Sequence, residues 1–315
     1  MKQGDLGGSV SPTTSTTITG LHGLLAPDAG LKPLHSGGRF YEGPVWIPEE
    51  RALRWSDVPA DQVLQYSEAT GGVELHPSSG GFANGRTITS DGVVVQCSHG
   101  NRRVERVDGT EVSEVVSRWD HGRLNSPNDV VVTGDGSIWF TDPPYGIVHP
   151  DEGHPGASEY GDSYVFRHEP STGRTIPVVI DVEEPNGLAF SPDESILYVA
   201  DTSCVRRPPG VGNHNIRAYD VQDGRCKNGR VFAVIDSGFA DGFRVDCRGN
   251  VWTSTGSGVS VYDPQGAHLG HIGTPEVVGN VCFGGDTGRT LFIAATSTMY
   301  AIETTVVDAG ARALA

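Results

Sequence analysis

Six oxygen-bearing side chains recur along this chain, each at or just before the start of a short apolar run that is typical of a β-strand. They are Glu42, Asn84, Asn128, Asn186, Asp241 and Asn280. Carboxylate and carboxamide oxygens are the ligands that hard divalent cations prefer. If the repeated units form a ring, the six side chains converge on one axis. The pattern therefore predicts a cation site, where a bound metal would polarise a carbonyl and activate water.

Each of these residues begins the same kind of unit, in which a first strand leads through a turn to a second strand. In the third unit, the apolar run 130–132 is followed by Gly-Asp-Gly at 134–136 and by a second run at 138–140. Such turns between apolar segments indicate β-hairpins. Successive units start about 40 to 60 residues apart, which is typical of the four-stranded blade of a propeller.

We therefore predict an all-β fold, a six-bladed β-propeller with four-stranded antiparallel blades. The last unit is one strand short, and residues 31–35 would supply the missing outer strand and close the ring. The prediction places a single propeller domain at 31–305, between an N-terminal extension at 1–30, partly flexible, and a C-terminal tail at 306–315.

Composition narrows the classes of partner. The formal net charge of −16 disfavours nucleic acid. No run approaches the ~20 apolar residues of a membrane span, and the polar start of the chain has no signal-peptide core. The five cysteines contain no C-x-x-C pair, which disfavours a zinc ribbon and a disulfide framework. We expect a cytoplasmic protein with no membrane partner. The chain carries no signature of an oligomeric state.

The loops that lead into the first strand and out of the second strand of each blade open on one face of a propeller, where ligands bind. We expect a second set of polar side chains to point to this mouth: Asp57, His99, Asp142, Asp201 and Thr255. His99 is a candidate substrate contact or proton carrier, and the alternative is an ordinary loop hydrogen bond. Two insertions, 143–162 and 203–215, are expected to form a partial lid that sets substrate choice.

The alternative for the asparagines and aspartates is turn formation, because Asn-Gly and Asp-Gly are common in turns. Glu42 is the exception, since glutamate is a poor turn residue. Four further acids lie in the hairpin turns at the opposite end of the strands, and we assign them to turn formation: Asp91, Asp135, Asp193 and Asp246. The G-x-S-x-G, H-E-x-x-H, P-loop and G-x-G-x-x-G motifs are absent from the sequence, which disfavours the activities that they mark.

Seven segments together resemble the SMP-30/gluconolactonase (regucalcin-like) family, and most of all its bacterial gluconolactonase branch. They lie in order at 42–46, 81–85, 99–103, 125–130, 139–146, 185–188 and 241–243. The resemblance implies a six-bladed lactonase with a single catalytic divalent metal held by Glu42, Asn186 and Asp241. It implies Asn128 as a further ligand or substrate contact, and Asp241 as the base. Calcium is the first expectation for the metal, with magnesium, manganese and zinc as alternatives.

By the same resemblance, Asp142 and His99 lie where members of the family bind substrate hydroxyls. We include Asn84, from the ring, as a further candidate substrate contact. Animal members of the family carry an arginine two positions before the residue that matches Asn128. Ser126 stands there in this chain, and Arg123 is the candidate substitute.

The sequence therefore leads to the hypothesis of metal-dependent hydrolysis of a small-molecule, gluconolactone-like sugar lactone to its aldonic acid. One alternative is a metal-dependent aryl esterase or phosphotriesterase on the same scaffold. Another is a non-enzymatic propeller that binds a ligand at its mouth. That alternative predicts an apolar, aromatic mouth without a metal, and the ring of Glu, Asn and Asp argues against it.

Overall fold

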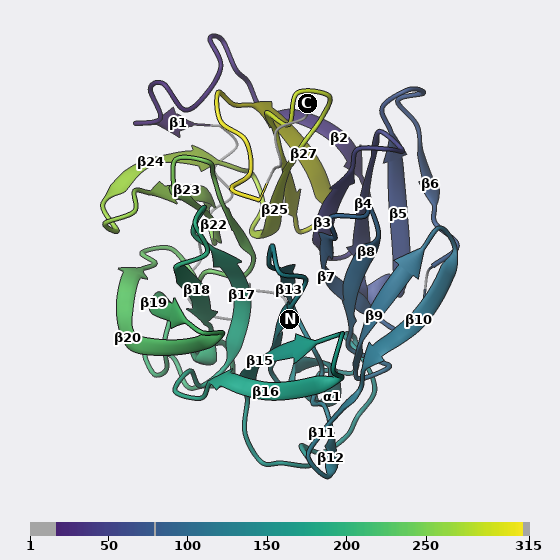
Figure 1. Ribbon diagram of the computed structural model, residues 1–315. Helices are drawn as coiled ribbons and strands as arrows, with labels where there is room; N and C mark the ends of the chain where they lie inside the picture. Colours follow the sequence, from purple (N-terminus) through teal and green to yellow (C-terminus); the bar gives the residue numbers. More distant parts are fainter. Residues whose placement is uncertain (1–16, 79, 311–315) are drawn as a thin grey trace.

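The computed structural model describes residues 17–78 and 80–310 and places their strands in six antiparallel blades around a ring (Figure 1). The predicted all-β, six-bladed propeller is confirmed. Among the described residues, three short helical segments interrupt the strands: η2 (Val58–Ala60), α1 (Tyr145–Val148) and η3 (Ser203–Arg206). Within the described ranges, no helix is long and apolar enough to cross a lipid bilayer.

The first strand of each blade lies innermost, and each innermost strand contacts those of the neighbouring blades. The strands of blades 1 to 3 are β3 (Tyr41–Ile47), β4 (Ala52–Asp57), β5 (Gln62–Ser67) and β6 (Val73–Leu75); β7 (Ala83–Ile88), β8 (Val94–Ser98), β9 (Arg103–Asp108) and β10 (Glu111–Val116); and β13 (Val130–Val132), β14 (Ile138–Asp142), β15 (Tyr164–Glu169) and β16 (Arg174–Val179). A small hairpin of β11 (Arg118–Trp119) and β12 (Gly122–Arg123) precedes blade 3.

Blades 4 to 6 complete the ring. Their strands are β17 (Pro185–Phe190), β18 (Ile196–Asp201), β19 (Asn215–Gln222) and β20 (Arg225–Val234); β21 (Phe243–Val245), β22 (Val251–Thr255), β23 (Gly258–Tyr262) and β24 (His268–Gly273); and β25 (Val278–Gly284), β26 (Thr290–Ala295), β27 (Thr298–Glu303) and β2 (Lys32–Ser36).

The ring closes as the sequence predicts. β2, from the N-terminal side of the domain, is the outer strand of blade 6 and pairs antiparallel with β27 (Figure 1). β1 (Ile18–Thr19) adds a fifth strand to blade 5 by pairing with β24, a contact that the sequence did not predict. Of the predicted flexible extension and tail, residues 1–16 and 311–315 lie outside the described residues.

The hydrophobic core lies mainly between neighbouring blades. Trp46 of β3 stacks on Phe292 of β26, with ring centroids 5.6 Å apart. Trp139 of β14 meets Phe190 of β17 edge-on at 5.1 Å, which joins blades 3 and 4 in the same way. Each innermost strand is thus packed between two neighbours, which fixes where its first residues lie relative to the adjacent blades.

The four hairpin-turn acids form turns, as predicted. Asp91 and Asp135 each accept a hydrogen bond at 2.6 Å from the threonine two residues earlier, Thr89 or Thr133. Asp193 accepts from Ser191 and Ser195, and Asp246 accepts the backbone N–H groups of residues 248 and 250.

Candidate functional site

A β-bulge at the start of the innermost strand positions several of the ring side chains. On β3, Glu42 pairs with Ser56 while Val45 pairs with Arg54, so β3 carries one extra residue. Equivalent shifts occur on β7 between residues 83 and 86, and on β17 between residues 185 and 188. A bulge turns a side chain away from the regular alternation of a strand. Asn84 and Asn186 lie within these bulges, Glu42 directly precedes its bulge, and all three line the central cavity.

Glycine follows the ring residue in four of the six units because the neighbouring blade approaches closely there. Gly43 has a φ of +54°, and a Cβ atom at this position would lie 1.8 Å from the backbone oxygen of Asn84. The Gly85 N–H donates to the Asn128 carbonyl at 2.8 Å, and the Gly187 N–H donates to the Asp241 carbonyl at 3.0 Å. These bonds connect consecutive members of the ring across blade boundaries.

Five of the six ring residues line one cavity that opens to solvent. They are Glu42, Asn84, Asn128, Asn186 and Asp241. The structure therefore brings together side chains from five blades. Asn280, the sixth, is buried beside the cavity and its Nδ2 donates to Glu42 Oε2 at 3.1 Å. The expectation that all six converge on the axis is thus correct for five.

Glu42 is 3% exposed and only one of its carboxylate oxygens is hydrogen-bonded. Oε2 accepts from the Gly43 N–H at 2.9 Å and from Asn280, whereas Oε1 has no hydrogen-bond partner among the described residues. Burial raises the pKa of the Glu42 carboxyl. Burying a carboxylate oxygen without a hydrogen-bond donor costs free energy, so we expect Oε1 to bind a cation or a proton.

Asp241 faces the same cavity. Burial raises the pKa of its carboxyl well above the usual range, and the negative charge of Glu42 raises it further. Two carboxyl groups in one buried space disfavour each other's ionisation unless a positive charge lies between them. The pair therefore has the electrostatic character of a cation site.

The insertion at 143–162 covers part of the mouth, and three of its residues line the cavity: Tyr145, His149 and Glu152. The Tyr145 hydroxyl hydrogen-bonds with Thr202 Oγ1. Thr202 Oγ1 in turn accepts from Asn186 Nδ2 at 3.4 Å. The insertion is therefore connected through Thr202 to one of the ring carboxamides.

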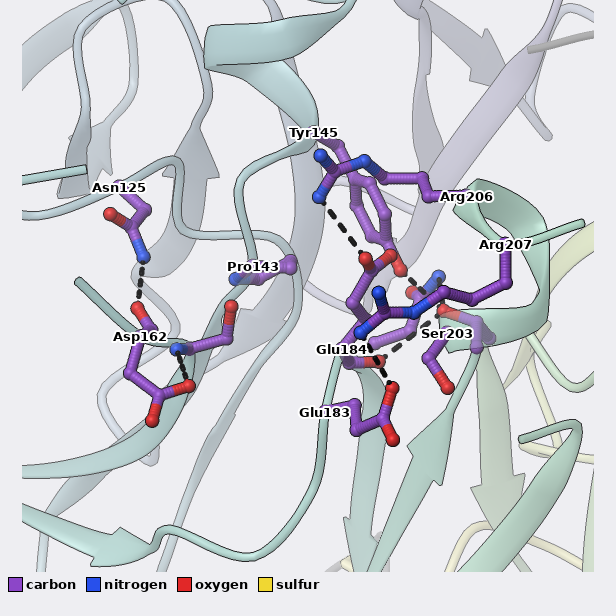
Figure 2. Close-up of polar contacts among 12 residues, drawn as sticks. Asn125, Pro143, Tyr145, Asp162, Glu183, Glu184, Ser203, Arg206 and Arg207 are labelled. Atoms are coloured by element: carbon purple, nitrogen blue, oxygen red, sulfur yellow. Dashed lines mark hydrogen bonds and ion pairs between the residues drawn. The ribbon is translucent and has the colours of Figure 1, made fainter. Parts of the chain in front are cut away.

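Figure 2 shows how the second insertion is fastened beside the first. Arg206 Nη1 lies 3.1 Å from Glu184 Oε1, and Arg207 Nη2 lies 3.0 Å from Glu183 Oε2. Burial raises the pKa of Glu184 to about 7, and the Arg206 guanidinium opposes the shift. These two ion pairs hold the residues next to Val205, which lines the cavity. They also pair both arginines of this segment with carboxylates.

The acids at the ends of the second strands point into their own blades rather than into the cavity. Asp142 is fully buried and accepts the backbone N–H groups of Asn125 and Ser126 at 2.8 Å, together with the Tyr160 hydroxyl. Burial raises the pKa of Asp142 to about 7. Asp57 and Asp201 accept backbone N–H groups in the corresponding way. None of the three lines the cavity.

Arg123 and His99, two other predicted substrate contacts, lie outside the cavity lining. Arg123 is exposed, and its Nη2 donates to the Asn101 carbonyl at 3.3 Å. His99 is fully buried, 3.2 Å from Asn84 and 3.4 Å from Asn128. Burial lowers the pKa of the His99 imidazole.

Sequence reasoning did not identify several lining residues, namely Phe40, Tyr145, Glu152, Val205 and Phe239. Phe40 and Phe239 stand two residues before Glu42 and Asp241, so a repeated aromatic at this spacing was the available signal. The insertions were predicted to form a partial lid, but their lengths do not say which side chains turn inward.

The donor set fits a hard divalent cation. It offers carboxylate and carboxamide oxygens from separate blades, and Glu42 Oε1 is a buried acceptor without a partner among the described residues. Within residues 17–78 and 80–310, no three His, Cys, Asp or Glu side chains cluster as a metal site. A cation here would therefore rely on Glu42 and Asp241 together with carboxamide oxygens.

Comparison with known proteins agrees with this geometry. Residues 40–297 match the family described as SMP-30/Gluconolactonase/LRE-like region. A gluconolactonase of Zymomonas mobilis is 32% identical over 90% of this chain and 84% of its own length. The structure of a gluconolactonase from Xanthomonas campestris superposes with a TM-score of 0.84 at 37% identity, covering 92% of this chain and 94% of that one.

A more distant neighbour shares the fold. It is a regucalcin from Agrobacterium tumefaciens, described as a calcium-binding protein, with a TM-score of 0.70 at 16% identity over 90% of this chain and 95% of its own. The family match extends over most of the propeller and includes all five cavity-lining members of the ring. This chain is a member of the SMP-30/gluconolactonase/LRE-like family.

Proposed function

We propose that this protein is a metal-dependent lactonase that hydrolyses a sugar lactone, gluconolactone-like in size, to the aldonic acid. The observation that carries the proposal is the convergence of Glu42 and Asp241, two buried or partly buried carboxylates, with three carboxamides on one cavity. Membership of a family that includes gluconolactonases supports the reaction class. The substrate is a small molecule, since relatives named as lactonases act on small lactones.

Glu42, Asn186 and Asp241 would hold the divalent cation, with Asn128 as a further ligand or a substrate contact. When bound, calcium or a related ion supplies Lewis-acid polarisation of the lactone carbonyl. Glu42 stays fixed during the reaction because Gly43 and Asn280 both donate to its Oε2. The remaining groups of the site then have to orient the lactone and move protons.

Asp241 is the proposed base. Its carboxylate accepts a proton from water as the water oxygen attacks the lactone carbonyl carbon. The ring C–O bond then breaks, and the proton passes to the departing alkoxide oxygen, which leaves an open-chain acid.

The other walls favour an uncharged sugar ring. Phe40, Val205 and Phe239 offer apolar surface for ring carbons, and Asn84 and Tyr145 offer polar groups for hydroxyls. The described lining contains no lysine or arginine, and Arg206 and Arg207 are paired with glutamates. An anionic lactone would therefore meet acidic walls without a compensating side chain.

A comparison of kcat/KM values tests the proposal. We expect gluconolactone to be hydrolysed more than about tenfold faster than an aryl acetate, a phosphotriester or 6-phosphogluconolactone at equal concentration. A preference for the aryl acetate or the phosphotriester would support the esterase alternative instead. Binding of the lactone without turnover would support a non-enzymatic propeller.

A further inference from the structure

His99 lies between the first insertion and the ring, directly beneath α1. It is fully buried. A Cβ atom on Gly146 of α1 would lie 2.5 Å from the Cβ of His99, which shows how closely the insertion packs on it. His99 itself is not part of the cavity lining, although both of its carboxamide neighbours are.

The contact between His99 and the insertion shows which ring nitrogen of His99 carries the proton. The Nδ1 atom lies 3.2 Å from the backbone oxygen of Glu152. A carbonyl oxygen can only accept a hydrogen bond, so Nδ1 carries the proton. In the neutral ring, Nε2 then carries the lone pair and can only accept.

Two carboxamides of the ring meet this acceptor. Nε2 lies 3.2 Å from Asn84 Nδ2 and 3.4 Å from Asn128 Nδ2. An NH₂ group can donate to a lone pair, whereas a carboxamide oxygen facing it would be repelled. In a carboxamide, oxygen and nitrogen point in different directions from one carbon. Holding both NH₂ groups on His99 therefore turns both Oδ1 atoms away from it.

We propose that His99 is a positioning residue: it anchors to the Glu152 carbonyl through Nδ1 and, through Nε2, fixes Asn84 and Asn128 with their oxygens toward the cavity. The inference rests on the proposed function, because it assumes that Asn128 is a cation ligand or a substrate contact. It makes the insertion at 143–162 a part of the site's framework, since the Glu152 carbonyl sets the tautomer of His99, which in turn orients one carboxamide of blade 2 and one of blade 3. Partners of this kind typically change cation affinity by about 10–100-fold when they are removed.

The role differs from that of a proton carrier or substrate contact. Either of those needs a ring nitrogen that reaches the cavity. Both nitrogens of His99 are already engaged with protein atoms, and the side chain has no exposed surface. A glutamine at this position offers Oε1 as an acceptor in place of Nε2, whereas a leucine offers none.

Calorimetric titration of calcium into chelator-treated protein, without lactone, tests the assignment. We expect His99→Leu to weaken calcium binding by about 10–100-fold and His99→Gln to restore most of the loss. His121→Leu is the matched control, because the His121 side chain is 97% exposed, and it should bind as wild type does. Equal calcium affinity in wild type and His99→Leu would overturn the proposal.

Two readouts separate this failure from a failure of the proposed function. Imidazole ¹⁵N spectra of the wild-type protein should show His99 protonated at Nδ1 and unprotonated at Nε2; a proton on Nε2 would overturn the inference, whether or not the protein is a lactonase. The pH dependence of kcat should be the same in His99→Gln and wild type. Loss of one limb of that profile in His99→Gln would identify His99 as a proton carrier and would also overturn it.

Discussion

Asn280 Nδ2 donates to Glu42 Oε2 at 3.1 Å, from blade 6 to blade 1 across the closure of the ring. The bond removes Asn280 from the set of candidate ligands and gives it a different role. It holds one oxygen of the Glu42 carboxylate, so that the buried Oε1 is the oxygen left for a ligand in the cavity. Residues at equivalent positions of the repeat therefore divide into those that line the cavity and one, Asn280, that supports a lining residue.

The first prediction concerns the charge of Asp241. Asp241→Asn removes one of the two ring carboxylates, Glu42 and Asp241, so we expect turnover of gluconolactone to fall at least about a hundredfold and calcium binding to weaken about 10–100-fold. The matched control is Asp193→Asn, the same change in a hairpin turn at the opposite end of the strands. It should leave both quantities unchanged. Steady-state kinetics and calorimetry measure them, and wild-type turnover in Asp241→Asn would contradict the assignment.

The second prediction concerns the close contact of blades 1 and 2. Gly43→Ala places a Cβ 1.8 Å from the Asn84 oxygen, at a φ of +54°. Gly109 has a similar φ of +58°, and a Cβ there would meet no atom within 4 Å, so Gly109→Ala carries the conformational penalty alone. We expect Gly109→Ala to cost about 1 kcal/mol in the free energy of unfolding and Gly43→Ala clearly more. Urea denaturation compares them, and equal losses would show that the clash is relieved without cost.

The third prediction concerns Tyr145 and Thr202. Thr202→Val removes the acceptor of the Asn186 carboxamide, whereas Tyr145→Phe removes a hydrogen bond that holds the Thr202 hydroxyl in place. We expect each change to lower kcat/KM and the two effects to be non-additive, with a coupling energy of about 1 kcal/mol. A double-mutant cycle on kcat/KM measures the coupling. Strict additivity would mean that Tyr145 acts on the substrate independently of Thr202.

The fourth prediction concerns pH. The pKa values of Glu42 and Asp241 are raised in the folded, metal-free protein, so the native state binds more protons than the unfolded chain between the ordinary carboxyl pKa of about 4 and the raised values. Their contribution to the free energy of unfolding therefore falls as pH rises through that window. We expect the metal-free wild type to lose stability from pH 5 to pH 8 relative to Asp241→Asn, as measured by urea denaturation.

The same shifts predict that cation binding releases protons. A ligand that needs both carboxylates ionised displaces the proton that they hold, so calcium affinity should rise with pH over this range. Calorimetry in buffers of different ionisation enthalpy measures the released protons. A proton release of zero at pH 6 would mean that the pair is already ionised in the metal-free protein.

The propeller could be predicted from the sequence because its repeat is local. Each unit carries its own apolar runs and Gly-rich turn, and residues 31–35 stand out as an unpaired strand. The five lining members of the ring could be predicted for the same reason, since each begins an innermost strand. The pairing of β1 with β24 could not, because two residues carry too little pattern.

Side-chain direction was the part that the sequence did not contain. Asp142 ends its strand next to the mouth, but two backbone N–H groups of its own blade draw its carboxylate inward. Asn280 fits the ring pattern, but its side chain donates a hydrogen bond to Glu42 of the next blade. In both cases the deciding partner is far away in sequence. Tyr145 and Glu152 reach the cavity only because the insertion folds back over His99.

The central claim is that Glu42, Asn186 and Asp241 bind one divalent cation. Anomalous diffraction from crystals grown with calcium, or with manganese in its place, tests it directly. The account predicts a single anomalous peak in the cavity, with an oxygen of each of these three residues at about 2.1–2.6 Å. An anomalous peak at another place in the protein would contradict it. So would the absence of any peak, if the same protein hydrolyses gluconolactone at full rate in the presence of a chelator.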